Sequence, residues 1–237
     1  FDAAKVRGDL VVRPSHEGEE LLALDGKTYA FAPGTMVIAD EQGPESIAGI
    51  MGGELSGCSE ETTEVFLESA YWDPIAIATA GRALKITSDA RYRFERGADP
   101  AFTQKGLELA TRMILDLCGG EASQVVTAGA IPDTTRSYPL DPAKVSSLVG
   151  MEIPEDRQRA TLEALGFRLD GNQAFVPSWR PDVQGAADLV EEVARIAGYA
   201  ALPSTPLPEV AYRPDGVLSV RQARIRTARR ALAAYGY

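Results

Sequence analysis

Histidine and cysteine are scarce in this chain, which has one histidine and two cysteines among 237 residues. Neither Cys58 nor Cys118 has a second cysteine at metal-ligand spacing, so neither a zinc site nor a disulfide framework is predicted. We expect both to be buried free thiols of a cytosolic protein. A Ser-His-Asp or Cys-His catalytic site would have to use His16, which lies in a polar stretch, and catalysis of this kind is not expected.

Long apolar runs are also missing. No stretch approaches the ~18 apolar residues of a membrane span, and no signal peptide is recognisable. Because 45% of the residues are hydrophobic, the chain can form one large or two modest globular domains. It opens at Phe1 without an initiator Met, and we interpret it as a fragment of a longer protein.

Basic residues are nearly absent from residues 17–68, which hold twelve acids and one lysine. Such a surface should repel phosphate backbones. Residues 209–237 have the opposite balance, six arginines against Glu209 and Asp215, within a total net charge of −10. These arginines could contact RNA, but we favour the interpretation that they form the solvent side of an amphipathic helix.

Turn and capping residues indicate a strand-rich first part. Strands are predicted at residues 10–13, 21–24, 36–39 and 65–72, with a hairpin turn at Asp25-Gly26. A helix over residues 74–84 follows, and a second one runs from the capping pair Asp99-Pro100 to Gly119.

Prolines at positions 132, 139 and 142 indicate a change of domain near residue 132. Helices over about 142–149 and 154–165 are predicted next, followed by a hairpin that turns at residues 170–172. This order is typical of a winged-helix arrangement. A Pro-rich linker over residues 201–216 leads to a last helix over about 217–234, which looks like the beginning of a third domain.

Glu68 is a candidate binding residue because strand alternation places it on the same face as Phe66, Ala70 and Trp72. A carboxylate on an apolar face is costly without a partner. That partner is either a basic residue, Arg82 or Arg91, or the hydroxyl of a ligand in an apolar slot. The glycines within residues 49–53 allow either a tight turn with positive φ or close approach of a ligand to the backbone, and no P-loop sequence follows them.

A second candidate site consists of carboxylates in and before a short helix. Asp188, Glu191 and Glu192 share one face, and Leu189, Val190, Val193 and Ile196 are assigned to the opposite face. With Asp182, these oxygen ligands would suit Mg²⁺. The alternative is a solvated helix face with a Glu191–Arg195 ion pair.

Several segments together resemble the beta subunit of bacterial phenylalanine–tRNA ligase. They occur in that family's order along nearly the whole chain: Ile38–Asp40, Gly49–Gly57, Glu61–Thr63, Phe66–Ala70, Arg93–Gly97, Ser178–Asp182 and Asp188–Tyr199.

The resemblance implies that residues 1–131 form an α+β editing module with a mixed or antiparallel sheet, which hydrolyses tyrosine mischarged onto tRNA(Phe). Editing is needed because a pocket for phenylalanine rejects an isostere with an added hydroxyl only weakly. By resemblance, Glu68 binds the tyrosine hydroxyl, Gly52 keeps the slot open, and Ser88 and Ala90 line its wall. No nucleophile is identified, so the expected mechanism is attack by a positioned water, assisted by the terminal ribose hydroxyl of the tRNA.

The resemblance further implies a small winged-helix-like α+β domain over residues 132–207, then a linker and the start of a catalytic-like domain over residues 208–237. Asp182, Asp188, Glu191 and Glu192 would bind Mg²⁺ at the junction with the alpha subunit. The partners implied are tRNA(Phe) and the alpha subunit, in a cytoplasmic α₂β₂ assembly without membrane or DNA contacts. ATP would be bound mainly by the alpha subunit. The alternatives are a docking scaffold whose editing has decayed and a free-standing Mg²⁺-dependent hydrolase.

The chain departs from the family pattern in three places. A histidine that the family places just before the equivalent of Phe1 lies outside this chain. Ser88 replaces a common threonine but keeps the hydroxyl. Lys85 stands where a glycine is common, so we expect a different loop before Ser88.

Overall fold

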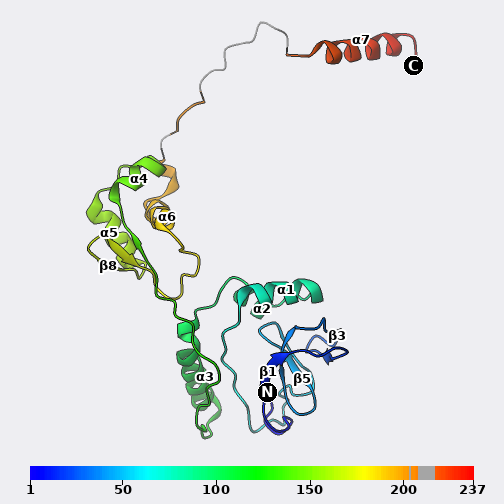
Figure 1. Ribbon diagram of the computed structural model, residues 1–237, viewed down its shortest axis with the longest axis vertical. Helices are drawn as coiled ribbons and strands as arrows, with labels where there is room; N and C mark the ends of the chain where they lie inside the picture. The colour runs from blue at the N-terminus through cyan, green and yellow to red at the C-terminus, as the bar shows by residue number, and fades with distance from the viewer. Residues whose placement is uncertain (203, 208–216) are drawn as a thin grey trace. The chain divides into compact units, whose positions relative to one another are not determined.

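The computed structural model describes residues 1–202, 204–207 and 217–237, and Figure 1 traces them from the N-terminus to the C-terminus. The chain divides into two units, Phe1–Ala201 and Leu202–Tyr237. Most of the predicted Pro-rich linker, together with Glu209 and Asp215, lies outside the described residues. In the described part, none of the helices combines the length and apolar character needed to cross a bilayer.

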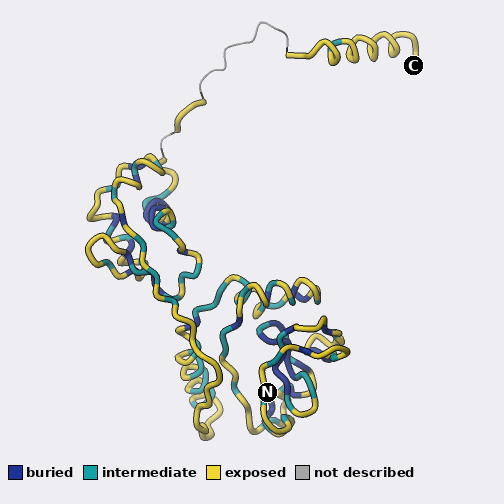
Figure 2. The backbone as a smooth tube through the Cα atoms, in the orientation of Figure 1, coloured by how far each residue is buried: buried dark blue, intermediate teal, exposed yellow. Residues whose placement is uncertain are grey.

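The first part of the larger unit is built on antiparallel strands. β1 (Val11–Pro14), β4 (Met36–Ala39), β5 (Pro44–Ile47) and β6 (Met51–Gly52) form a sheet in the order β1-β4-β5-β6. A hairpin of β2 (Glu20–Leu22) and β3 (Thr28–Ala30) turns at Asp25-Gly26 as predicted, and Gly26 has a φ of +76°. Val37 and Ile47 are fully buried in the core of this part, which appears in dark blue within the strands of Figure 2.

The strand predicted over residues 65–72 is wrong. Only Val65 forms a β-bridge, with Asp2, and the backbone N–H of Phe66 donates to the carbonyl of Phe1 at 2.9 Å. A strand requires a neighbour along its length, and beyond Phe66 no described strand lies in register with this segment. Residues 67–72 are therefore irregular in structure, and the single apolar face predicted for this segment is wrong, because Trp72 is buried whereas Phe66 is 47% exposed and Glu68 is exposed.

Helices follow the strands where their caps predict them. α1 (Pro74–Leu84) begins at the cap Asp73, whose carboxylate accepts from the backbone N–H of Ala76 at 2.8 Å. α2 (Asp89–Phe94) and the 3₁₀ turn η1 (Pro100–Phe102) precede α3 (Thr103–Cys118), which ends at Gly119 as predicted. α3 buries none of its residues, and its Leu117 is 77% exposed.

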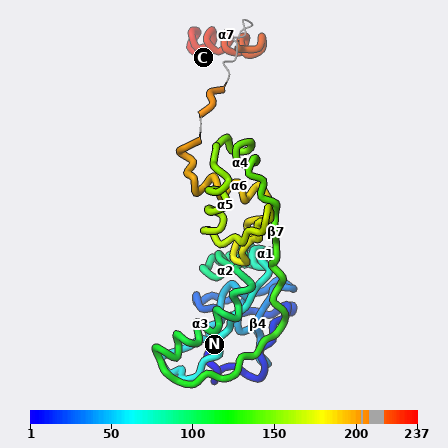
Figure 3. Tube along the Cα trace, turned by 90° about the vertical axis from the view of Figure 1, so that its left-hand side faces the viewer, coloured from blue at the N-terminus to red at the C-terminus, as the bar shows by residue number. Residues whose placement is uncertain are grey.

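The second part of this unit has its own core. β7 (Ser137–Pro139), β8 (Arg168–Asp170) and β9 (Gln173–Phe175) form an antiparallel sheet in the order β7-β9-β8. α4 (Pro142–Val149), α5 (Glu155–Ala164) and α6 (Ala186–Ala197) group with these strands in both Figure 1 and Figure 3, and η2 (Tyr199–Ala201) follows. The predicted helices and hairpin are confirmed, whereas β7 was not predicted. Val145, Leu162 and Leu189 are fully buried in this core.

The smaller unit contains α7 (Val220–Ala234), which lies within the range predicted for the last helix. Ser219 and Gln222 form a capping box at its start. The α+β class predicted from the sequence is confirmed, with antiparallel sheets throughout the described residues. The prediction of buried thiols is wrong because Cys58 lies in an exposed loop and Cys118 lies at the exposed end of α3.

Candidate functional site

The glycine loop after β5 is shaped by close packing. Gly49 has a φ of +67°, and a Cβ there would lie 2.5 Å from Cδ1 of Trp72. At Gly53 a Cβ would lie 2.6 Å from the carbonyl oxygen of Glu45. The positive φ of Gly49 supports the interpretation of a tight turn there, whereas Gly53 has no positive φ, forms a β-bridge with Ala23, and needs glycine because the backbone of Glu45 lies so close. Gly52 lies at the end of β6, where a Cβ would be 3.0 Å from Cδ1 of Leu24, so a side chain there would crowd Leu24.

Ser88 connects this loop to α2. Its hydroxyl donates to the carbonyl of Ile50 at 2.6 Å and accepts from the backbone N–H of Arg91 at 3.1 Å, which caps α2. Ser88 is therefore bound to Ile50, which precedes Gly52 by two residues. Ala90 lies in the first turn of α2 and is exposed.

Arg91 does not pair with Glu68, which was one prediction for that carboxylate. Its guanidinium pairs with Glu95 at 3.0 Å and donates to the carbonyls of Gly81 and Ile86. Across the described residues, neither Arg91 nor Arg82 forms an ion pair with Glu68. The two structural partners proposed for Glu68 are thus wrong, because Arg91 connects α1 to α2 instead.

Glu68 combines solvent contact with a perturbed pKa. The residue is exposed, yet desolvation by the surrounding protein raises the pKa of its carboxyl. The described residues include no hydrogen bond from Glu68 to Gly52, Ser88 or Ala90. The hydrogen bond from Ser88 to Ile50 thus connects the loop of Gly52 to α2, and no hydrogen bond of the described residues connects Glu68 to that loop.

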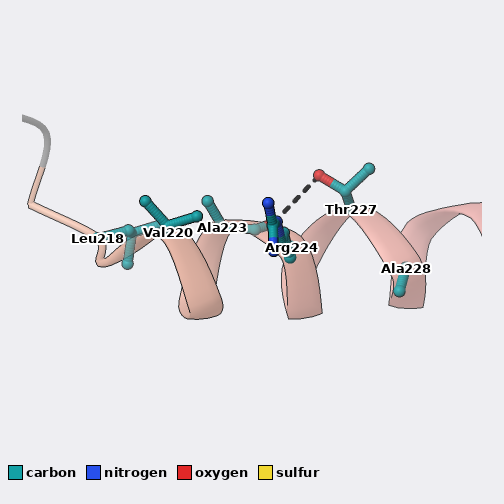
Figure 4. A pocket seen from close by; sticks show the side chains of 6 residues that line it. All are labelled: Leu218, Val220, Ala223, Arg224, Thr227 and Ala228. Atoms are coloured by element: carbon teal, nitrogen blue, oxygen red, sulfur yellow. Dashed lines mark hydrogen bonds between the residues drawn. The ribbon is translucent and has the colours of Figure 1, made fainter.

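Two surface hollows occur elsewhere. One, of about 600 Å³, lies between α1 and the segment Ala32–Met36 and includes Trp72, but none of the four predicted pocket residues. The other, drawn in Figure 4, is lined by residues of α7 and its cap region: Leu218, Val220, Ala223, Arg224, Thr227 and Ala228. The first hollow contains none of the predicted pocket residues, and the second is an open surface along a single helix. Neither corresponds to the predicted editing pocket.

Arg180 is the centre of the second candidate site. Its Nε and Nη2 lie 2.8 Å from Oδ1 and 2.6 Å from Oδ2 of Asp182, and its Nη1 lies 2.8 Å from Oε2 of Glu192. Arg195 donates to the same Oε2 at 2.8 Å. The carboxylates of Asp182 and Glu192 are therefore joined by a guanidinium group.

These contacts change the expected faces of α6. Glu192 is only 5% exposed, and Ile196, which was assigned to the buried face, is 49% exposed. The alternative ion pair Glu191–Arg195 is wrong, because Arg195 pairs with Glu192 instead. Hydrogen bonds from Arg180 and Arg195 lower the pKa of Glu192 to about 2, and Arg180 also lowers the pKa of Asp182.

The remaining two carboxylates are placed differently. Oδ2 of Asp188 accepts from the backbone N–H of Gln184 at 2.7 Å, and Glu191 is exposed. Over the ranges that the structure describes, no three acidic, histidine or cysteine side chains are grouped so that they could hold a metal ion. The four carboxylates have suitable chemistry for Mg²⁺, but in this arrangement they do not fit it, because guanidinium groups take the oxygens of Asp182 and Glu192.

Arg136 is a residue that the sequence did not single out. Its guanidinium donates to the carbonyl of Arg180 at 2.9 Å and to those of Pro181 and Val183 at 3.3 Å. It therefore fixes the loop that carries Asp182. A lone arginine before a short strand gives no sequence signal for this role, since the accepting carbonyls lie more than forty residues further along the chain.

Comparisons with known proteins assign both parts of the chain to known domain families. The family model of the B3/4 domain matches residues 1–119, and that of the tRNA synthetase B5 domain matches residues 138–199. The chain therefore belongs to the class of proteins in which a B3/4 domain is followed by a B5 domain. All four predicted pocket residues lie in the first match, and all four carboxylates lie in the second.

Relatives define the family further. Over the whole of this chain, phenylalanine–tRNA ligase beta subunits are 68% identical in Cereibacter sphaeroides, 64% in Ruegeria pomeroyi and 54% in Paramagnetospirillum magneticum. The chain belongs to the family of phenylalanine–tRNA ligase beta subunits and spans 30% of the length of these relatives. A crystal structure of an N-terminal fragment of the phenylalanyl-tRNA synthetase beta subunit from Pyrococcus horikoshii covers 81% of this chain and 57% of its own, with 16% identity and a TM-score of 0.39.

Proposed function

We propose that this chain is the editing segment of a phenylalanine–tRNA ligase beta subunit and that it hydrolyses Tyr-tRNA(Phe). The observation that carries the proposal is the match of the B3/4 domain to residues 1–119, which include Glu68 and the Gly52–Ser88 region. In the whole enzyme, the reaction would join phenylalanine to tRNA(Phe) with ATP in the cytoplasm. The partners would be tRNA(Phe) and the alpha subunit, in an α₂β₂ assembly.

Glu68 is proposed to recognise the tyrosine hydroxyl. Its side chain is exposed, and among the described residues no basic side chain pairs with it, so the carboxyl can accept a hydrogen bond from a phenol. A site that hydrogen-bonds a hydroxyl rejects the analogue without that hydroxyl strongly. This preference would protect correctly charged Phe-tRNA(Phe) from hydrolysis.

Hydrolysis itself is assigned to a positioned water. The glycine loop supplies backbone without side chains at Gly52, and Ser88 holds the loop through the Ile50 carbonyl. The ribose hydroxyl at the end of the tRNA would assist the water. Ser88 acts here as a positioning residue, because its hydroxyl already has both a donor and an acceptor partner within the protein.

The test is hydrolysis of Tyr-tRNA(Phe) by the complete alpha–beta enzyme. Glu68→Ala is expected to slow this hydrolysis by about ten- to a hundredfold, the effect of one hydrogen bond to a charged group. Glu64→Ala is the matched control, because Glu64 is an exposed acid four residues earlier in the same loop. Equal rates in the wild type and the Glu68 variant would remove Glu68 from the site.

The second candidate function is a docking scaffold with decayed editing. The excess of acids in residues 17–68 favours a protein partner over RNA on that surface. Slow hydrolysis of Tyr-tRNA(Phe) by the wild-type enzyme would support this function. Mg²⁺ binding at the junction with the alpha subunit stays a prediction from the family resemblance.

A further inference from the structure

α2 presents an exposed aromatic ring beside two arginines. Tyr92 is 58% exposed, and the guanidinium carbon of Arg96 lies 3.7 Å from the centre of its ring. Arg93, the next residue after the tyrosine, is exposed as well. Because residues three and four apart are neighbours on a helix surface, Tyr92, Arg93 and Arg96 lie on the same side of α2 and its end.

The charge around this side of α2 is positive. From Arg82 to Arg96 the chain has five basic residues and two acids, whereas residues 17–68 have twelve acids and one lysine. A phosphate backbone would be repelled by the acidic segment and attracted to α2. We propose that Tyr92, Arg93 and Arg96 bind the single-stranded end of an RNA, with one base stacked against the ring and phosphates beside the arginines.

The contacts within α2 leave the ring and one arginine available. Over the described residues, Arg93 forms no ion pair and the hydroxyl of Tyr92 forms no hydrogen bond. Glu95 pairs with Arg91 at 3.0 Å and with Arg96 at 3.1 Å. Its negative charge is therefore shared between two other arginines, and Arg93 keeps its positive charge for a phosphate.

The surroundings of the ring favour a nucleic acid over an apolar protein surface. The exposed neighbours of Tyr92 on this side of α2 are Asp89, Arg93 and Arg96, so the surface is charged and mostly basic. The core of a protein–protein interface is instead depleted of charged residues. Every nucleobase has a π face, and exposed aromatic rings with nearby arginines bind single strands through stacking and cation–π contacts.

This surface lies beside two of the residues proposed for the editing pocket. Ser88 caps α2, and Ala90 lies in its first turn. Arg93 is three residues beyond Ala90, which is roughly 4.5 Å along the helix axis. An RNA end bound at Arg93 would thus lie next to the proposed pocket wall. The identity of this RNA as tRNA(Phe) rests on the proposed function.

The experiment measures the fluorescence of tRNA(Phe) that carries 2-aminopurine in place of its terminal adenosine, bound to the complete alpha–beta enzyme. Stacking against Tyr92 should quench the probe. Tyr92→Leu keeps an apolar side chain without a π face, and it should lose this quenching. Tyr92→Phe is the matched variant that keeps the ring, and its quenching should equal that of the wild type.

The salt dependence of tRNA(Phe) affinity tests the charged contact. Arg93→Gln is expected to weaken binding and to reduce the slope of log Kd against log salt concentration by about one, the share of one phosphate contact. Arg168→Gln is the control, because Arg168 is exposed and also lies over an aromatic ring, 3.7 Å from the centre of Phe175, in the second part of the unit. Its affinity and slope should equal those of the wild type.

Two results overturn the proposal: equal quenching in the wild type and Tyr92→Leu, or a salt slope that Arg93→Gln leaves unchanged. Hydrolysis of Tyr-tRNA(Phe) by the same enzymes separates this proposal from the proposed function. Quenching that depends on Tyr92 in an enzyme without hydrolysis would support the RNA contact and refute editing. Fast hydrolysis with quenching independent of Tyr92 would refute the RNA contact and support editing.

Discussion

Lys85 is the C-cap of α1 and adopts a left-handed conformation with a φ of +56°, alone among the described non-glycine residues. For a residue with a Cβ, this conformation costs roughly 1–2 kcal/mol. Its backbone N–H still donates to the carbonyl of Arg82 at 3.2 Å, so the helix end depends on the conformation being kept. At the end of α1, Lys85 thus adopts the left-handed backbone conformation that usually requires glycine at a helix C-terminus.

Lys85→Gly is therefore expected to stabilise the protein. Glycine removes the strain but adds about 0.4–1 kcal/mol of entropy to the unfolded chain. The net increase in the free energy of unfolding should be about 0.5–1 kcal/mol. The lysine side chain is exposed and forms none of the ion pairs in the described residues, so its loss should cost little.

Urea denaturation followed by tryptophan fluorescence would measure this change. Trp72 is buried in the first core, and Trp179 is 57% exposed, so a Trp179→Phe background isolates the signal of the first core. Lys85→Ala is the control, because alanine keeps the Cβ and should keep the strain. The reasoning is refuted if glycine gives no higher urea midpoint than lysine, or if alanine gives the same gain as glycine.

Three further changes test the packing and charges. Leu162→Ala should lower the free energy of unfolding by about 2–5 kcal/mol in urea denaturation, because Leu162 is fully buried in the second core. Asp73→Ala removes the cap of α1 and should cost about 1 kcal/mol in the same assay. Burial raises the pKa of Glu45 above its unfolded value near 4.5, so its neutral form favours folding and stability is lost as pH rises through the folded pKa. Glu45→Gln should remove this loss, and urea midpoints measured between pH 4 and pH 8 would show it as a flatter profile.

Local signals in the sequence were sufficient for the helices but not for every strand. α1 spans the predicted residues because Asp73 and Pro74 specify a helix start without help from the rest of the fold. The segment after Val65 has strand-like residues, but strand formation depends on a neighbour that local sequence does not reveal. β7 was missed for the complementary reason, since its three residues contain a proline and gain their structure from pairing with β9.

The same contrast between local signals and tertiary contacts applies to the two candidate sites. Motif segments singled out Glu68, Gly52 and Ser88, whose role as a pocket stays a prediction. Spacing on a helix placed Glu192 on an outward carboxylate face, but the structure buries it. Glu192 is buried because Arg180, twelve residues earlier, and Arg195 neutralise it. This pairing depends on which loop packs against the helix, and the spacing of residues within the helix carries no information about that loop.

The contrast between Glu68 and Glu192 bears on what each carboxylate can do. Hydrogen bonds from two arginines lower the pKa of Glu192 to about 2, so this group stays ionised and bound to its partners at neutral pH. Desolvation raises the pKa of Glu68, which has no basic partner among the described residues. A carboxyl without a basic partner keeps lone pairs free to accept a hydrogen bond from a neutral donor such as a phenol. The proposed recognition of a tyrosine hydroxyl is therefore compatible with Glu68, whereas Glu192 holds the loop of Arg180 against α6.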